Sequence, residues 1–198
     1  MLRRLHLTLA DFAAAPRDAV AVTGPSGAGK TQLLRAIADL DPNEAAIDLD
    51  GAARDDQPAP AWRARVAYVP ATPAWWADSV AAHFLSPPDG AALASVGLPA
   101  DCGAWPVARL STGETVRLGL LRALERKPQV LLTDEPTGPL DADAKAAVER
   151  VLTAFCGAGG ILLFTTHEPA QIGRLGARVL AVAADGQVTE TSAGEAAA

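Results

Sequence analysis

The chain has 198 residues, of which 17 are Lys or Arg and 23 are Asp or Glu, so its formal net charge is −6. This length indicates one domain that buries about 70% of its unfolded surface and needs neither a disulfide nor a metal to fold. The 49% hydrophobic content excludes a disordered chain, and the acidic balance argues against nucleic acid as a partner and against electrostatic attachment to anionic lipid.

Several features predict a cytoplasmic chain. Residues 1–15 resemble a signal peptide, but His6 and Asp11 interrupt the apolar stretch, and its leucines alternate with other residues as in a strand. No apolar run reaches the ~18 to 20 residues that span a bilayer, so we expect no direct membrane insertion. Cys102 and Cys156 stand apart without a CxxC partner, and we expect small buried or half-buried thiols in a reducing compartment.

The first third of the chain alternates strand and helix patterns. The β-rich run Ala19–Thr23 ends at a glycine, and apolar residues then recur at helical spacing over residues 30–40. Further strands are expected at Ile47–Leu49 and Val66–Val69, and residues 55–60 between them are polar and contain proline, as in a surface loop.

Residues 72–110 differ in character, because they carry several prolines and most of the tryptophans around short helical patterns. We expect an inserted, mostly helical lobe there. The rest of the chain then alternates helices and strands before a final hairpin: a helix at 112–126, a strand at Val130–Thr133, a helix at 141–155, a strand at Ile161–Thr165, a short helix and the turn at Asp185 and Gly186. Strands separated by helices imply a parallel sheet that is covered on both faces.

The segment GPSGAGKT fits the pattern G-x-x-x-x-G-K-[ST], with a strand before it and a helix after it. Glycines let the backbone wrap around phosphates, and the amide groups and the helix N-terminus direct positive dipoles at them. Lys30 adds a charge toward the β- and γ-phosphates, and the Thr31 hydroxyl can ligate Mg²⁺. The pattern therefore predicts nucleotide binding, with a plain glycine-rich turn as the alternative, by Gly24, Pro25, Ser26, Gly27, Ala28, Gly29, Lys30 and Thr31.

The segment VLLTDEP is a buried strand that ends in two carboxylates, Asp134 and Glu135. Ligands of open α/β sheets bind beyond the carboxyl ends of the strands. Asp134 would hold Mg²⁺ through water there, and Glu135 would orient or deprotonate an attacking water. A helix or turn cap is the structural alternative.

The segment LSTGE opens a predicted helix. Ser111 followed by Glu114 has the spacing of a capping box, which is a structural role. The same free N–H groups and the serine hydroxyl can also bind an anion. Taken alone, the pattern favours the cap.

These three motifs in this order, with His167 after a buried strand, resemble the nucleotide-binding subunits of ABC transporters over nearly the whole chain. By that resemblance, residues 24–31 are similar to the Walker A loop and residues 130–135 to Walker B. Three further motifs match: the signature motif (Leu110, Ser111, Thr112, Gly113, Glu114), the D-loop (Leu140, Asp141) and the switch histidine (His167).

The resemblance implies an α/β P-loop NTPase fold: a mostly parallel sheet flanked by helices, a small N-terminal antiparallel part and an inserted short helical lobe. Residues 1–71 and 111–198 would form a RecA-like core within a single ABC ATPase domain (1–198), and residues 72–110 would form the lobe. Independently of the resemblance, the low-complexity composition of the C-terminus predicts that residues 194–198 are a frayed tail.

The same resemblance implies a mechanism. Two copies would pair head to tail around two ATP, so that Ser111 and Gly113 contact the ATP bound at the partner's Lys30. Glu135 would act on water and His167 would hold the γ-phosphate. Hydrolysis, with Mg²⁺ as cofactor, would drive an integral membrane transport subunit, with this chain peripheral at the inner face of the cell membrane.

Departures from the family pattern matter as well. Ala71 stands where the family usually has a glutamine that senses Mg²⁺ and the γ-phosphate, Thr112 replaces a glycine of the signature motif, and Val116 replaces a glutamine. Phe12 and His6 are the candidates for the aromatic residue that stacks on adenine. We therefore expect slow hydrolysis.

Trp75 and Trp76 follow Ala71, where the family docks its membrane partner. They belong either to the core of the lobe or to that contact, and because neighbouring side chains point in different directions, one can face in and the other out. Other functions remain open: an ATP sensor with little turnover, a soluble non-transport member of the superfamily, or a small P-loop kinase. The short lobe is also similar to compact bacterial cassettes of metal or iron export.

Overall fold

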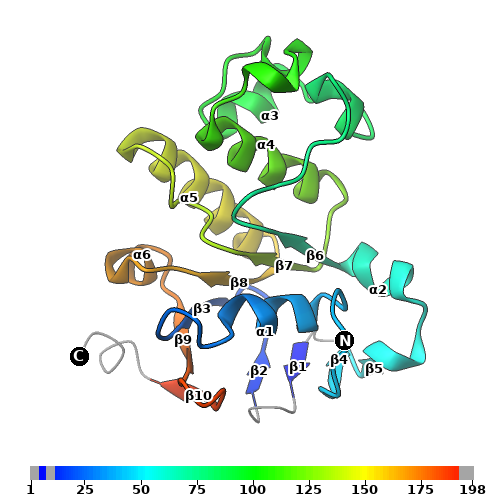
Figure 1. Cartoon of the computed structure of the whole chain (residues 1–198), viewed down its shortest axis with the longest axis vertical. Coiled ribbons are helices and arrows are strands. Elements are labelled where there is room, and N and C mark those ends of the chain that lie inside the picture. Colours follow the sequence, from blue (N-terminus) through cyan, green and yellow to red (C-terminus); the bar gives the residue numbers. More distant parts are fainter. Residues whose placement is uncertain (1–4, 8–11, 192–198) are drawn as a thin grey trace.

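The computed structural model describes residues 5–7 and 12–191, with side chains from residue 12 onward. Its centre is a six-stranded sheet in the order β10-β9-β3-β8-β7-β6 (Figure 1). The strands β3 (Ala19–Thr23), β6 (Val66–Val69), β7 (Val130–Thr133), β8 (Ile161–Thr165) and β9 (Arg178–Val182) run parallel. β10 (Val188–Thr191) returns antiparallel to β9 after the predicted turn. The mostly parallel sheet is confirmed.

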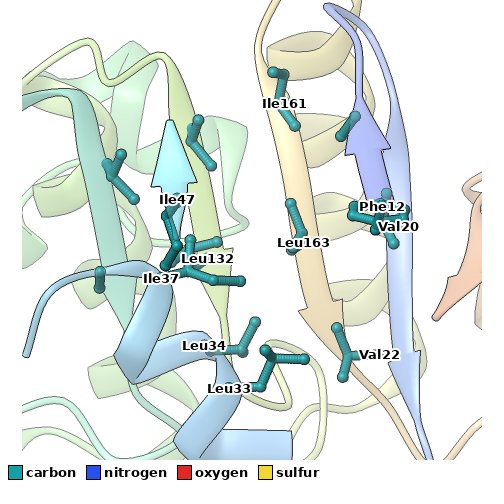
Figure 2. Close-up of a cluster of buried hydrophobic side chains, with 14 of the residues drawn as sticks. Phe12, Val20, Val22, Leu33, Leu34, Ile37, Ile47, Leu132, Ile161 and Leu163 are labelled. Atoms are coloured by element: carbon teal, nitrogen blue, oxygen red, sulfur yellow. The ribbon is translucent and has the colours of Figure 1, made fainter. Parts of the chain in front are cut away.

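Both faces of this sheet are covered, because successive residues of each strand point to opposite sides. Val20 and Val22 of β3 face the helix α1 (Lys30–Ile37), where Figure 2 shows Leu33, Leu34 and Ile37 among the side chains of the sheet. The intervening residues Ala19 and Ala21 pack toward α5 (Ala142–Gly157) on the other face. This two-sided burial explains why β7 and β8 are buried at every position.

A second, antiparallel sheet in the order β2-β1-β4-β5 lies beyond α1 (Figure 1). Its strands are β1 (Leu5–Leu7), β2 (Phe12–Ala14), β4 (Ile47–Leu49) and β5 (Ala52–Ala53). Phe12 is 1% exposed within the core between this sheet and α1. The prediction that Phe12 stacks on adenine is therefore wrong, because its ring is buried in this core and has no free face for a ligand. The side chain of His6 lies outside the described residues.

The surface loop predicted at residues 55–60 is wrong at its end, where residues 59 and 60 already belong to a helix. A 3₁₀ turn, η2 (Arg54–Asp56), leads into the helix α2 (Ala59–Arg65), in which a proline occupies the first turn, where it needs no N–H partner. α2 carries Trp62, which is fully buried, and whose Nε1 donates a hydrogen bond of 2.8 Å to the carbonyl of Ile37. Asp39 follows with a φ of 57°, so α1 ends at Ile37 rather than at residue 40.

Trp62→Phe should lower the free energy of unfolding by about 1–3 kcal/mol, because it leaves the buried carbonyl of Ile37 without a donor. Urea unfolding followed by circular dichroism measures the change. Trp76→Phe is the matched control, since that side chain is 71% exposed, and it should stay within about 0.5 kcal/mol of the wild type. Equal effects at the two positions would contradict the capping role of Trp62.

Residues 72–110 form only short helical pieces at the top of Figure 1. These are η3 (Val80–His83), α3 (Gly90–Ser95), η4 (Cys102–Ala104) and η5 (Val107–Arg109), and they pack on the long helix α4 (Thr112–Glu125). Their core holds Val80, Leu93 and Cys102 against Leu118 of α4. The prolines of this segment keep its helices short, because proline cannot continue a hydrogen-bonded turn.

Cys102 and Cys156 are both free and buried, as the sequence predicts. Burial raises the pKa of the Cys156 thiol to about 11 and also raises that of Cys102. Both side chains therefore pack as neutral thiols. Over the described part of the chain, none of the helices has the length and apolar character needed to cross a bilayer.

Candidate active site

The loop between β3 and α1 has the geometry of a phosphate cradle. Gly24 adopts a φ of 139°, and a Cβ built on it would lie 2.1 Å from the carbonyl oxygen of Val182. Only glycine fits there, since the loop passes directly against the end of β9. The chain then turns into α1 at Lys30, so the N-terminus of that helix faces the loop.

Lys30 lies inside the loop, with 8% of its surface exposed. Its Nζ donates hydrogen bonds of 2.8 Å to the carbonyl of Gly24 and 2.9 Å to that of Pro25. An ammonium group has three donors, so one remains for a phosphate oxygen. The positive charge is thus held within the loop before any ligand arrives.

Two hydroxyls hold the carboxylate of Asp134 at the end of β7. Thr31 Oγ1 donates to Asp134 Oδ2 at 2.6 Å, and Thr165 Oγ1, from the end of β8, donates to the other oxygen, Oδ1. The Thr165 hydroxyl also accepts a hydrogen bond of 2.9 Å from the backbone N–H of Glu135. Residues from α1, β7 and β8 therefore meet at this edge of the sheet.

This donor set fits Mg²⁺. The ion prefers oxygen ligands, and it is typically held by one or two protein groups together with substrate phosphates and water. Thr31 and Asp134 supply a hydroxyl and a carboxylate beside the loop. Within residues 5–7 and 12–191 there is no cluster of three or more His, Cys, Asp or Glu residues that could hold a metal.

Glu135 and His167 face each other across the pocket. His167 Nε2 lies 3.1 Å from Glu135 Oε1, and the two side chains are 58% and 42% exposed. Glu135 has a φ of 47°, a left-handed conformation that costs about 1–2 kcal/mol for a residue other than glycine. The bond from its N–H to Thr165 stabilises that conformation, and such strain is common at functional sites.

These groups line one open pocket of about 330 Å³, together with Ser26, Gly27, Gly29 and Gln32. Gln32 was not among the predicted site residues, although its position directly after Thr31 at the start of α1 could have indicated that it lines the pocket. Ala28 precedes these residues in the loop, and Gly24 and Pro25 line the adjoining pocket. Ala71, just beyond β6, does not contribute to the pocket walls.

Tyr68 stands on β6 near this site. Burial foremost, and the negative charge of Asp134 after it, raise the pKa of the Tyr68 hydroxyl to about 12. The phenol therefore stays neutral through the physiological range and adds no charge beside Asp134.

The segment 110–114 lies away from this pocket. Ser111 Oγ accepts a hydrogen bond from Glu114 N at 3.3 Å, and Ser111 N donates to Glu114 Oε2 at 2.8 Å, so the predicted capping box is confirmed. Ser111 and Thr112 are exposed. The helix start offers free N–H groups to the surface rather than to the pocket of its own chain.

Of the two residues predicted as a D-loop, Leu140 lies beside that segment. A Cβ on Gly113 would come within 3.1 Å of Leu140 Cδ2. Asp141 caps α5 by accepting a hydrogen bond of 2.8 Å from Ala144 N. Leu110 packs against the core of the segment 72–110, and Gly113 is the residue of the segment 110–114 that lies close to Leu140.

The two adjacent tryptophans differ as expected. Trp75 is partly buried and packs against the hydrophobic core around Leu93. Trp76 is 71% exposed. Only Trp76 is free to take part in a surface contact with most of its ring.

Comparisons with known proteins agree with this geometry. The family described as ABC transporter matches residues 7–138. The chain is 38% identical over 168 residues to the cytochrome c biogenesis ATP-binding export protein CcmA of Nitrobacter winogradskyi, covering 80% of this chain and 82% of that protein. It is 36% identical over 190 residues to the aliphatic sulfonates import ATP-binding protein SsuB of Ralstonia nicotianae, covering 90% of this chain and 64% of the relative.

The fold is also similar to that of a solved structure over nearly the whole chain. The structure of a bacterial Atm1-family ABC exporter with ATP bound superposes with a TM-score of 0.79 over 98% of this chain and 40% of that chain. The two sequences are 22% identical, so this likeness concerns the fold alone.

Proposed function

The chain belongs to the ABC transporter family, whose ATP-binding subunits hydrolyse ATP to drive a separate membrane subunit. From that membership we propose the following mechanism for this chain. Two chains pair head to tail around two ATP. Each ATP lies between the loop 24–31 of one chain and the segment 110–114 of the other. The observation that carries this proposal is that residues 110–114 stay outside their own nucleotide pocket and open onto the surface.

The catalytic roles follow from the pocket. Phosphoryl transfer to water needs positioning and electrostatic stabilisation more than covalent chemistry. Lys30 and the loop amides bind the phosphates, Glu135 orients the attacking water and accepts its proton, and His167 donates a hydrogen bond to the γ-phosphate. Mg²⁺, held by Thr31 and Asp134, neutralises charge on the phosphates when bound.

The proposed membrane subunit also determines where in the cell this chain would work. We propose that the chain works in the cytoplasm, at the inner face of the cell membrane, and that Trp76 and the half-buried Trp75 lie at the contact with that subunit. Their position between β6 and η3, beside the C-terminal end of α4, supports this assignment. Export of metal or iron remains a prediction from the short segment 72–110.

The head-to-tail arrangement predicts complementation between two inactive variants. Lys30→Ala damages the loop and Ser111→Arg damages the signature segment, so each homodimer has two defective sites. An equimolar mixture should recover about a quarter of the wild-type activity, because half of the dimers then carry one intact site of two. Phosphate release measured over a range of protein concentration tests this, and the wild-type specific activity should rise with concentration.

Circular dichroism of each variant alone is the control for folding. An inactive mixture of two folded variants, or a specific activity that does not depend on concentration, would contradict the shared site. Binding of ATP without turnover at every concentration would instead support the second candidate, an ATP sensor, which Ala71 favours because its methyl group can neither ligate Mg²⁺ nor relay the state of the γ-phosphate.

Ala71→Gln should raise the Mg²⁺-dependent turnover by about 2- to 10-fold, which corresponds to one additional hydrogen bond in the transition state. Ala71→Met is the matched control, since it has a similar length without the amide. An unchanged or lower rate in the glutamine variant, or an equal gain in the methionine variant, would show that the missing amide does not limit hydrolysis.

A further inference from the structure

Gln171 is a buried polar side chain that does not line the nucleotide pocket. It lies on α6 (Pro169–Arg174), the short helix that follows His167, and it is 0% exposed. Its Nε2 donates a hydrogen bond of 2.9 Å to Thr137 Oγ1, and Thr137 is itself 4% exposed. Within the described part of the chain, Oε1 of Gln171 has no hydrogen-bond partner. The amide group is thus buried for the sake of a single bond.

The burial of this amide is unfavourable for stability. Moving an amide group from water into a protein interior costs free energy, and one hydrogen bond recovers only a part of that cost. A leucine of similar volume would leave no unpaired atom at the same place. Positions that break such a local rule are expected where function demands it, which directs attention to the one bond that Gln171 forms.

That bond reaches the loop that carries Glu135. Thr137 lies two residues after Glu135, between β7 and α5. The N–H of Gly138 donates to the carbonyl of Glu135 at 3.1 Å, and the N–H of Leu140 donates to the carbonyl of Thr137 at 3.2 Å, so the loop consists of two linked turns. A Cβ on Gly138 would lie 3.4 Å from Glu135 Oε2. A shift of Thr137 would therefore move the backbone directly beside the carboxylate of Glu135.

The other end of the bond is tied to the segment that carries His167. The backbone N–H of Gln171 donates a hydrogen bond of 3.0 Å to the carbonyl of Glu168, which directly follows His167. His167 Nε2 in turn lies 3.1 Å from Glu135 Oε1. The hydrogen bond between Gln171 and Thr137 therefore closes a ring of contacts, and it joins the two segments whose side chains face each other in the pocket.

Further contacts near these segments lie at other places. The Thr165 hydroxyl holds the N–H of Glu135 at the ends of the strands, before the loop begins. The ion pairs of Glu168 with Lys145 and Arg174 lie at the surface, and exposed ion pairs fix geometry only weakly. The buried bond of Gln171 is thus the contact best suited to hold the middle of the loop against α6.

We propose that Gln171 is a positioning residue for ATP hydrolysis. Through Thr137 it holds Glu135 and His167 at the separation at which the first acts on the attacking water and the second on the γ-phosphate. This role rests on the proposed function, which assigns those two tasks, and it adds a residue outside the pocket that sets their distance. A displacement of about 1 Å at a reacting group can cost about 100-fold in rate, so one buried bond is sufficient to control turnover.

The test removes the bond from either side. Gln171→Leu and Thr137→Val keep nearly the original volumes without the polar groups, and each should lower the single-turnover rate of ATP hydrolysis by about 10- to 100-fold. The KM for ATP should change by less than about 2-fold, because the loop 24–31 that binds the phosphates is unchanged. Thr137→Ser keeps the hydroxyl and should retain the rate within about 3-fold.

The double variant that combines Gln171→Leu with Thr137→Val separates positioning from stability. Each single variant leaves a buried polar group without its partner and should lower the melting temperature, whereas the double variant replaces both groups by apolar ones and should recover it. Its rate of hydrolysis should nevertheless stay as low as in the single variants. Gln187→Leu makes the same chemical change at an exposed position and is the matched control that changes neither quantity.

Recovery of the rate together with the melting temperature in the double variant would overturn the proposal, because the bond would then act through stability alone. A wild-type rate in Gln171→Leu would overturn it as well. The wild type is measured beside the variants over a range of protein concentration. If the wild type hydrolyses ATP and the variants match it, only the role of Gln171 is refuted, whereas a wild type that never hydrolyses ATP refutes the proposed function and this role with it.

Discussion

Glu135→Gln should lower the rate of ATP hydrolysis by about 10²- to 10⁴-fold, the usual contribution of a general base. Glutamine keeps the size of the side chain but cannot accept a proton from water. The backbone bond to Thr165 and the left-handed conformation can both remain, so the pocket should keep its shape. ATP binding should therefore survive, and the dimer should persist longer once ATP is bound.

Single-turnover hydrolysis and equilibrium binding of ATP, measured on the same preparation, separate the two effects. Glu168→Gln is the matched control. This carboxylate follows His167 directly, but it forms ion pairs with Lys145 and Arg174, and its loss should change the rate by no more than about 3-fold. Substantial turnover in Glu135→Gln would assign the proton acceptor to another group.

Lys30→Ala should weaken ATP binding by about 10- to 100-fold, because a charge-assisted hydrogen bond to phosphate contributes about 1.5–3 kcal/mol. The ammonium group is held inside the loop by the carbonyls of Gly24 and Pro25, so the charge is in place before the phosphate binds. The stabilisation of the wild type against heat by ATP should be largely lost in the variant.

Lys30→Arg provides the comparison, since it keeps the charge but spreads it over a larger planar group that does not fit the space of an ammonium. It should bind ATP more weakly than the wild type. Melting temperatures without nucleotide report any change of the loop itself. If Lys30→Ala keeps the full shift of melting temperature with ATP, then the loop amides alone bind the phosphates.

Local sequence patterns were sufficient for four strands of the central sheet. The runs Ala19–Thr23, Val66–Val69, Val130–Thr133 and Ile161–Thr165 are strands with these bounds in the structure. Each is apolar and short and is bounded by turn or loop residues, and such a run has few alternatives to a buried parallel strand.

Patterns failed where long-range packing decided the outcome. Phe12 looked available to a ligand, but the ring is buried against α1. Residues 55–60 looked like a loop by composition, yet α2 begins at Ala59, and Trp62 of this helix donates a hydrogen bond to the end of α1, which makes a helix favourable there. Both outcomes depend on a neighbour that is distant in sequence, which no local window contains.

The sequence alone determined which chemistry is possible, because the glycines, Lys30, Thr31 and the Asp134–Glu135 pair are short-range motifs with fixed spacing. Only the tertiary structure decided which groups meet. It brings Thr31, Asp134 and Thr165 into one hydrogen-bonded set from three elements, places Glu135 3.1 Å from His167, and orients Trp76 outward beside Arg122. Spacing along the chain sets local geometry, whereas contacts between distant segments depend on the packing of the whole sheet and its helices.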